Sequence, residues 1–294
     1  MNDQSQPSDA VPRLIDWANA RDEIRAMLMT STRAKPNAVV DVFSDYDIIL
    51  VLRDIHPFVE NKRWLQTFGQ VLVSYWDPIH ASSVPGIDQT SSVIQYANGL
   101  KIDFTLWPVE LMQHIATHKT LPADLDDGYV VLVDKDKITV GMPPPTYTIY
   151  IPVKPTAQAF ATWVEEFFSD PPYVAKCLWR DELMPAKWCL DYDMKHVYLR
   201  RMLEWRVECD HNWSLPAGNL GKGLKKYLPV DIWAELEGTY AEAGIKENWA
   251  ALFKTMALFR RVAIEVADCL GYDYSHDLDA GVTAYVKKMK KMDG

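Results

Sequence analysis

The chain has 294 residues and a formal net charge of −9, with a sequence pI near 5.3. Such an acidic chain argues against a nucleic-acid backbone as its ligand, since phosphate binding requires clustered cationic side chains. A cationic small molecule would instead be attracted to it. The length exceeds the usual size of one hydrophobic core, so we expect two domains.

The sequence carries no signal for a membrane or for secretion. Residues 1–12 are polar, which predicts disorder, and no run of about eighteen apolar residues occurs. The cysteines are widely spaced and lack a Cys-x-x-Cys pair, which argues against a zinc site and against a disulfide scaffold; they are Cys177, Cys189, Cys209 and Cys269. We therefore expect a soluble protein of the reducing cytoplasm, without a membrane partner.

The first half predicts a mixed α/β unit. Apolar spacing predicts a helix over 13–27, and the hydroxyl-rich turn Thr30-Ser31-Thr32-Arg33 follows it. A β-branched run that ends at Leu52 predicts a strand. Further along, the patterns predict helices over 59–68 and 108–118 and strands over 70–75, 92–96, 100–107 and 129–134. Asn98-Gly99 predicts a hairpin between two of these strands.

The second half predicts helices alone. Prolines between 141 and 155 indicate a stiff linker. Beyond it, helical spacing of apolar residues predicts helices over 156–169, 173–191, 193–209, 231–243, 246–270 and 277–291. We therefore predict an α+β protein, with a mixed β-sheet flanked by helices in residues 1–150 and an all-α helical bundle in residues 151–294.

Two aspartates, Asp45 and Asp47, stand at the start of the strand that ends at Leu52. Side chains at i and i+2 of a strand point to the same side, so the two carboxylates converge. A cation relieves their repulsion, and Mg²⁺ prefers oxygen ligands and substrate phosphates. A third carboxylate, Asp103, lies on the polar face of the strand predicted over 100–107, together with Lys101. The alternative, which needs no metal, is an acidic turn in front of a strand.

Together these features predict a nucleoside triphosphate site. A trio of carboxylates can hold two Mg²⁺ ions on the attacking and leaving oxygens of an in-line phosphoryl displacement. The turn before the strand can offer the hydroxyls of Ser31 and Thr32 and backbone N–H groups to the terminal phosphates, with Arg33 adding charge. Catalysis would then rest mostly on positioning and electrostatic stabilisation.

These motifs resemble the nucleotidyltransferase fold shared with DNA polymerase beta. In chain order they resemble its Gly-Ser turn, its Asp-x-Asp strand and the strand of its third carboxylate, and they read Ser31-Thr32-Arg33, Phe43-Ser44-Asp45-Tyr46-Asp47-Ile48 and Ile102-Asp103-Phe104-Thr105-Leu106. The chain departs from that pattern at Ser31. There a side chain replaces the glycine that normally lets the backbone approach phosphate.

More narrowly, the chain resembles the aminoglycoside 6-adenylyltransferases, the streptomycin-modifying enzymes, over nearly its whole length. The motifs that carry this resemblance are Glu166-Phe167-Phe168, Tyr173-Val174-Ala175-Lys176, Arg180-Asp181-Glu182-Leu183, Ala186-Lys187 and Gly271-Tyr272. The resemblance implies transfer of AMP from ATP to an aminoglycoside hydroxyl, release of pyrophosphate and antibiotic resistance, with Mg²⁺ as cofactor. By matching positions, it implies that Asp45, Asp47 and Asp103 hold the metal and that Ser31, Thr32 and Arg33 lie against the triphosphate.

The helical half adds further candidates. One helical stripe, by i, i+3/i+4 spacing, holds Lys176, Arg180, Leu183 and Lys187. Its cationic side chains could reach the triphosphate; a solvated face paired with acids is the alternative. Asp181 or Glu182 could remove the proton from the acceptor hydroxyl, if a domain cleft desolvates the carboxylate and raises its pKa. For either acid, helix capping or a surface salt bridge is the alternative.

Two other functions stay open. The first keeps the nucleotidyl transfer and changes the acceptor to a lincosamide, another small hydroxylated molecule or a protein side chain. The second is a nucleotide-binding sensor that lost turnover when the Gly-Ser turn changed at Ser31.

Overall fold

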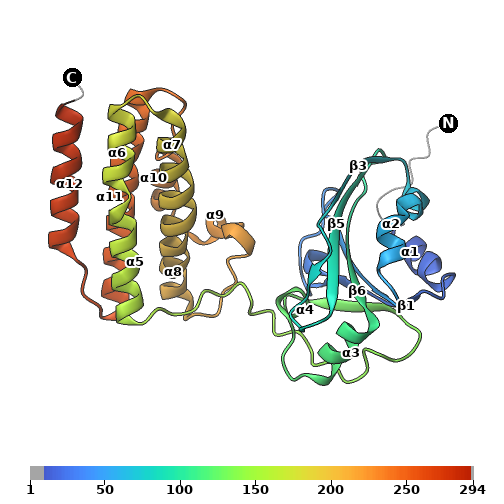
Figure 1. Cartoon of the computed structure of the whole chain (residues 1–294). Helices are drawn as coiled ribbons and strands as arrows, with labels where there is room; N and C mark the ends of the chain where they lie inside the picture. Colours follow the sequence, from blue (N-terminus) through green and yellow to red (C-terminus); the bar gives the residue numbers. More distant parts are fainter. Residues whose placement is uncertain (1–9, 293–294) are drawn as a thin grey trace. The chain divides into compact units, whose positions relative to one another are not determined.

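The computed structural model describes residues 10–292. The chain divides into two compact units, one that ends at Ile149 and one that begins at Tyr150 (Figure 1). The first contains a mixed sheet with helices and the second is helical, which confirms the predicted α+β class. Among the described residues, no helix is long and apolar enough to cross a membrane. The predicted disorder of residues 1–9 lies outside this range, whereas residues 10–12 belong to a helix.

Within the described part of the first unit, the strands form a sheet in the order β3-β5-β6-β2-β1-β7, with β4 paired to β5. β2 and β6 are parallel, and the other neighbours are antiparallel. The strands are β1 (Ile24–Thr30), β2 (Tyr46–Leu52), β3 (Val71–Trp76), β4 (His80–Ala81), β5 (Asp88–Tyr96), β6 (Lys101–Pro108) and β7 (Tyr129–Asp134).

Helices pack on both faces of this sheet. The face that carries Ile48 and Leu50 packs against α1 (Ala10–Asn19), α2 (His56–Glu60) and η3 (Lys62–Phe68). The face that carries Ile49 and Val51 packs against α3 (Val109–Thr117) and α4 (Ala123–Asp126). Because strand side chains alternate, Asp47 belongs to the second face, at the end of β2 where the apolar core stops.

The predicted helix over 13–27 is wrong in its second half. Helix α1 ends at Asn19, and Ile24–Thr30 form β1, which is buried along its whole length. β1 lies between β2 and β7, and its side chains belong to the apolar cores on both faces of the sheet. A strand buried on both faces reads as a continuous apolar run, and periodicity alone cannot distinguish such a run from a helix.

From Tyr150 on, the regular structure of the described residues is helical. Its centre is the long helix α11, where the ring of Phe259 stacks on Phe167 with the centroids 3.6 Å apart. The helices are α5 (Ala157–Ser169), α6 (Pro171–Trp179), α7 (Leu183–Lys187), η4 (Trp188–Leu199), α8 (Arg200–His211), η5 (Asn219–Gly221), α9 (Leu224–Tyr227), α10 (Val230–Glu237), α11 (Ile245–Leu270) and α12 (His276–Lys291).

The helix predicted over 173–191 is interrupted after α6. Asp181 adopts the left-handed conformation, with φ of 58°. Its N–H donates to the carbonyl of Leu178 at 3.1 Å, and the N–H of Glu182 donates to the carbonyl of Cys177 at 2.9 Å. This pattern is a Schellman motif, which ends a helix. Helices α7, η4 and α8 then follow one another directly, so the break predicted before residue 193 is also wrong.

A disulfide joins Cys209 of α8 to Cys269 of α11, with the Cα atoms 6.2 Å apart. The sequence argued against a disulfide scaffold and did not predict this single bond. The two residues are 60 positions apart in sequence, and they meet because α8 and α11 run side by side, as the ion pair between Arg206 and Glu265 also shows. Widely spaced cysteines do not reveal such a pairing, since helix packing decides it.

Candidate active site

The predicted carboxylates gather where β2 and β6 run side by side. In the parallel register, Asp47 lies opposite Asp103, and Asp45 stands two residues before Asp47. Residues that face each other on paired strands point to the same side of the sheet. The local geometry of two strands therefore brings the three carboxylates onto one face.

Lys101 joins two of these carboxylates. Its Nζ donates to Oδ2 of Asp45 at 2.5 Å and to Oδ2 of Asp103 at 3.0 Å. The other oxygen of Asp103, Oδ1, is buried without a hydrogen-bond partner among the described residues. A buried carboxylate oxygen without a partner is costly. The sequence placed Lys101 on the same face as Asp103 but assigned it no role. Its position two residues before Asp103 is the signal that could have identified it as a partner of the carboxylates.

The pKa of Asp47 is raised to about 6, first by burial and then by the charges of Asp103 and Asp45, while Lys101 and a hydrogen bond from Ser31 act in the opposite direction. Burial is also the main cause that raises the pKa of Asp103. Burial is the first cause of both shifts, and the charge of Asp45 adds to each of them. The arrangement therefore suits a divalent cation with oxygen ligands.

The hydroxyl-rich turn follows β1 directly, as the short helix η2 (Ser31–Ala34). Ser31 has a φ of 58°, and its hydroxyl donates a hydrogen bond to the carboxylate of Asp47. Thr32 is half-buried. The turn thus lies against the carboxylates, and it places a serine in the left-handed conformation, which glycine adopts more readily.

Arg33 holds the backbone in front of β2. Its Nη2 donates to the carbonyl of Ser44 at 2.9 Å, and its Nε donates to the carbonyl of Asp45 at 3.0 Å. The guanidinium carbon also lies 3.8 Å from the centroid of the Tyr46 ring, as a cation–π contact. These bonds fix the segment that carries Asp45.

The candidate residues of the helical unit lie at the end of α6 and just beyond it. The ammonium of Lys176 lies 4.9 Å from the centroid of the Tyr173 ring. Arg180, Asp181 and Glu182 are exposed within this unit. Because the helix is interrupted between α6 and α7, the predicted cationic stripe does not continue into α7.

Comparison with known proteins decides the family. A family model described as Streptomycin adenylyltransferase matches residues 6–289. The chain belongs to this family. Aminoglycoside 6-adenylyltransferase of Bacillus subtilis (strain 168) is 32% identical over 278 residues, which cover 93% of this chain and 94% of that protein. The resemblance stated from the motifs is thereby confirmed.

A second aminoglycoside 6-adenylyltransferase, from Campylobacter jejuni, is 30% identical over 284 residues, which cover 96% of this chain and 94% of the relative. A crystal structure of an aminoglycoside 6-adenyltransferase from Bacillus subtilis matches with a TM-score of 0.44 at 27% identity, over 99% of each chain.

For this member of the streptomycin adenylyltransferase family, Ser31→Gly is expected to be more stable than Ser31→Ala by about 1 kcal/mol, since glycine relieves the left-handed strain that any Cβ causes. Both variants lack the hydroxyl that contacts Asp47, so their difference isolates the backbone. Urea unfolding measures it. Equal stability of the two variants would contradict a strained turn.

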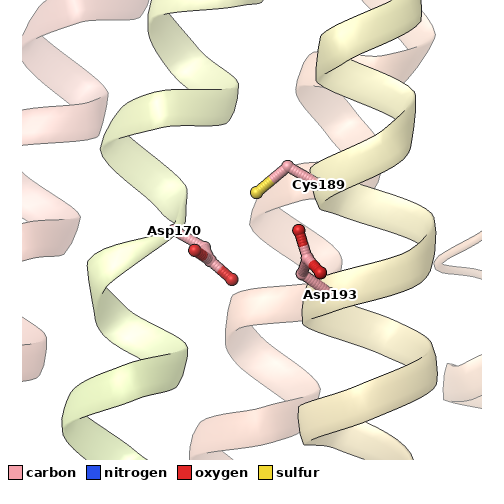
Figure 2. Close-up of side chains that lie close together, drawn as sticks. All are labelled: Asp170, Cys189 and Asp193. Carbon is pink, nitrogen blue, oxygen red and sulfur yellow. The ribbon is translucent and has the colours of Figure 1, made fainter.

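The described helical unit contains a second group of titratable side chains, outside the carboxylate face (Figure 2). The carboxylates of Asp170 and Asp193 and the sulfur of Cys189 point toward one another. One oxygen of each carboxylate and the sulfur lie within 4.8 Å of one another. The pKa of Asp170 is raised to about 6 by burial and by the charge of Asp193, although a hydrogen bond from the Cys189 thiol opposes the shift.

This shift predicts a pH dependence of stability. Since Asp170 holds its proton more tightly in the folded than in the unfolded chain, the free energy of unfolding should fall as pH rises from about 4 to about 6. Asp170→Asn should remove that part of the decrease, as thermal melts at several pH values would show. Asp268→Asn, at an exposed carboxylate of α11, is the matched control. A pH profile for Asp170→Asn identical to that of the unsubstituted protein would contradict the assignment.

Proposed function

We propose that this chain transfers AMP from ATP to a hydroxyl of an aminoglycoside of the streptomycin type, releases pyrophosphate and so confers resistance to the antibiotic. Family membership supports adenylylation of an aminoglycoside. The observation that carries the chemistry is the position of Asp47 opposite Asp103 on adjacent parallel strands, with Asp45 on the same face. We propose that the unit ending at Ile149 is the nucleotidyltransferase domain and that the unit from Tyr150 on is a C-terminal helical domain.

Mg²⁺ is the cofactor that fits this face. Asp45, Asp47 and Asp103 offer only carboxylate oxygens, and one of these oxygens, Oδ1 of Asp103, is buried without a hydrogen-bond partner among the described residues. Hard divalent cations prefer such oxygen donors. When bound there, Mg²⁺ would neutralise charge on the triphosphate and on the leaving pyrophosphate.

In the proposed reaction, the acceptor oxygen forms a bond to the α-phosphorus of ATP while the bond from that phosphorus to the bridging oxygen breaks. We propose that Ser31, Thr32 and Arg33 contact the nucleotide and that Lys176 and Arg180 add positive charge from the helical unit. Their task is to orient the triphosphate and to stabilise the charge that leaves with pyrophosphate.

The proton of the acceptor hydroxyl must pass to a base, and we propose Asp181 ahead of Glu182. Asp181→Asn is expected to lower kcat about a hundredfold and to flatten the acid limb of the pH–rate profile. Asparagine tolerates the left-handed conformation that Asp181 adopts, so the variant should fold. Glu182→Gln serves as the matched comparison. If only Glu182→Gln flattens the acid limb, the roles of the two residues are reversed.

The acceptor is expected to be cationic. The chain carries a net charge of −9, and such a field attracts a positively charged aminoglycoside. We place the reaction in the cytoplasm, where ATP is available, and we expect no nucleic-acid or membrane partner.

The direct test is pyrophosphate release on mixing the protein with MgATP and streptomycin. Release that depends on streptomycin and on Mg²⁺ is the expected result. Release only with a lincosamide or a protein acceptor would keep the nucleotidyl transfer but show that streptomycin is not the acceptor. ATP binding without release under any of these conditions would overturn the transferase and support the sensor.

A further inference from the structure

We propose that Lys101 is an exchangeable counter-ion: it neutralises the carboxylate face of the nucleotide-free protein and keeps a divalent cation out until the nucleotide arrives. This inference rests on the proposed function and assigns the order in which cation and nucleotide bind. It concerns a residue to which neither the motifs nor the proposed reaction gives a role.

The register of β2 and β6 places Lys101 among the carboxylates. Tyr46 pairs with Ile102, and Asp47 pairs with Asp103. Continued by one residue in front of β2, the same register brings Asp45 level with Lys101. The ammonium lies within hydrogen-bond distance of Asp45 and Asp103. Lys101 therefore lies inside the carboxylate group, where a divalent cation would bind.

The charges on this face are unequal. One ammonium stands against three carboxylates, so two negative charges stay unbalanced when all are ionised. Oδ1 of Asp103 is buried without a partner among the described residues, which means that Lys101 satisfies the face only in part. A dication would satisfy it better. However, a dication and an ammonium on the same oxygens repel each other, so the binding of one displaces the other.

Lys101 is free to move in a way that a buried lysine is not. Its side chain is 29% exposed, against 37% for Asp45 and 27% for Asp103. Both ion pairs are thus partly open to water, and partly exposed pairs break at small cost. The four-carbon stem can carry the ammonium away from the carboxylates without a change in the backbone.

The nucleotide supplies what this displacement requires. A triphosphate brings further oxygen ligands for the cation and a negative charge next to which the released ammonium can lie. Without the nucleotide, a dication that displaces Lys101 gains only the carboxylate ligands. The displaced ammonium then has no negative partner and repels the dication. Cation and nucleotide should therefore bind cooperatively, and Lys101 is the residue that makes them do so.

The test measures Mn²⁺ affinity by isothermal titration calorimetry and electron paramagnetic resonance, without and with a non-hydrolysable ATP analogue. Without nucleotide, Lys101→Met should bind Mn²⁺ about tenfold more tightly than the unsubstituted protein. The analogue should then enhance Mn²⁺ binding less in Lys101→Met than in the unsubstituted protein, because no ammonium has to be displaced. Lys101→Arg keeps the charge and should retain the large enhancement.

Lys137→Met is the matched control. It carries the same change of charge within the same unit, at an exposed position just after β7. The end of β7 pairs with Ala26, at the opposite end of β1 from the carboxylates, so the Mn²⁺ affinity of this variant should equal that of the unsubstituted protein. Circular dichroism and thermal melts establish that each variant folds. The proposal is overturned if Lys101→Met binds Mn²⁺ no more tightly than the control.

The failure of the proposed function has a separate signature. Adenylylation of streptomycin by the unsubstituted protein decides that question, and the Mn²⁺ affinity of the nucleotide-free variants is measured independently of turnover. An active transferase in which Lys101→Met leaves Mn²⁺ binding unchanged would refute the counter-ion role alone.

Discussion

Asp47→Asn is expected to lower kcat/KM for streptomycin adenylylation about a thousandfold, because it removes one of the three charged carboxylates proposed to hold Mg²⁺. The same variant should be at least as stable as the unsubstituted protein at neutral pH. The pKa of Asp47 is raised to about 6 by burial and by neighbouring carboxylates, so above that pH the ionised side chain destabilises the folded state. Steady-state kinetics and thermal melts of one preparation measure both effects.

The combination separates loss of chemistry from loss of fold. Asp16→Asn is the matched control, since Asp16 is an exposed carboxylate of α1, a helix on the opposite face of the sheet; its activity should be unchanged. Full activity of Asp47→Asn would remove this residue from the proposed metal site. A large loss of stability in that variant would mean that Asp47 has a structural role instead.

Reduction of the Cys209–Cys269 disulfide is expected to lower the free energy of unfolding by about 4 kcal/mol, since the bond closes a loop of 60 residues that gains chain entropy once it is opened. The corresponding fall in Tm is about 10 °C. The bond lines a cavity of about 570 Å³, and Cys269 is exposed, so a small phosphine or thiol can reach it. Calorimetry with and without reductant measures the difference.

The double variant Cys209→Ser/Cys269→Ser is the control, and its Tm should not respond to reductant. In the denatured protein, a thiol reagent should count two free cysteines before reduction, which are Cys177 and Cys189, and four after it. An unchanged Tm on reduction would contradict a stabilising bond. Because the cytoplasm keeps thiols reduced, the purified, oxidised protein should be more stable than the form proposed to act in the cell.

The sequence predicted those elements whose pattern is local. Asp45 and Asp47 interrupt an apolar run at the start of β2, and Asn98-Gly99 marks the hairpin between β5 and β6, so both strands and their polar face could be located. β1 was missed because a strand covered on both faces has no period that distinguishes it from a helix. The left-handed residue Asp181 was missed because aspartate, unlike glycine, does not mark a helix end.

By itself, the sequence determined the α+β class, the family and the residue types of the candidate site, since these depend on periodicity and on motifs that neighbouring residues carry. Only the tertiary structure decided that Asp47 lies opposite Asp103, that Lys101 bridges two of the carboxylates, and that Cys209 meets Cys269. Each of these contacts joins residues that strand register or helix packing brings together. Register and packing follow from burial across the whole unit, and short-range pattern does not contain them.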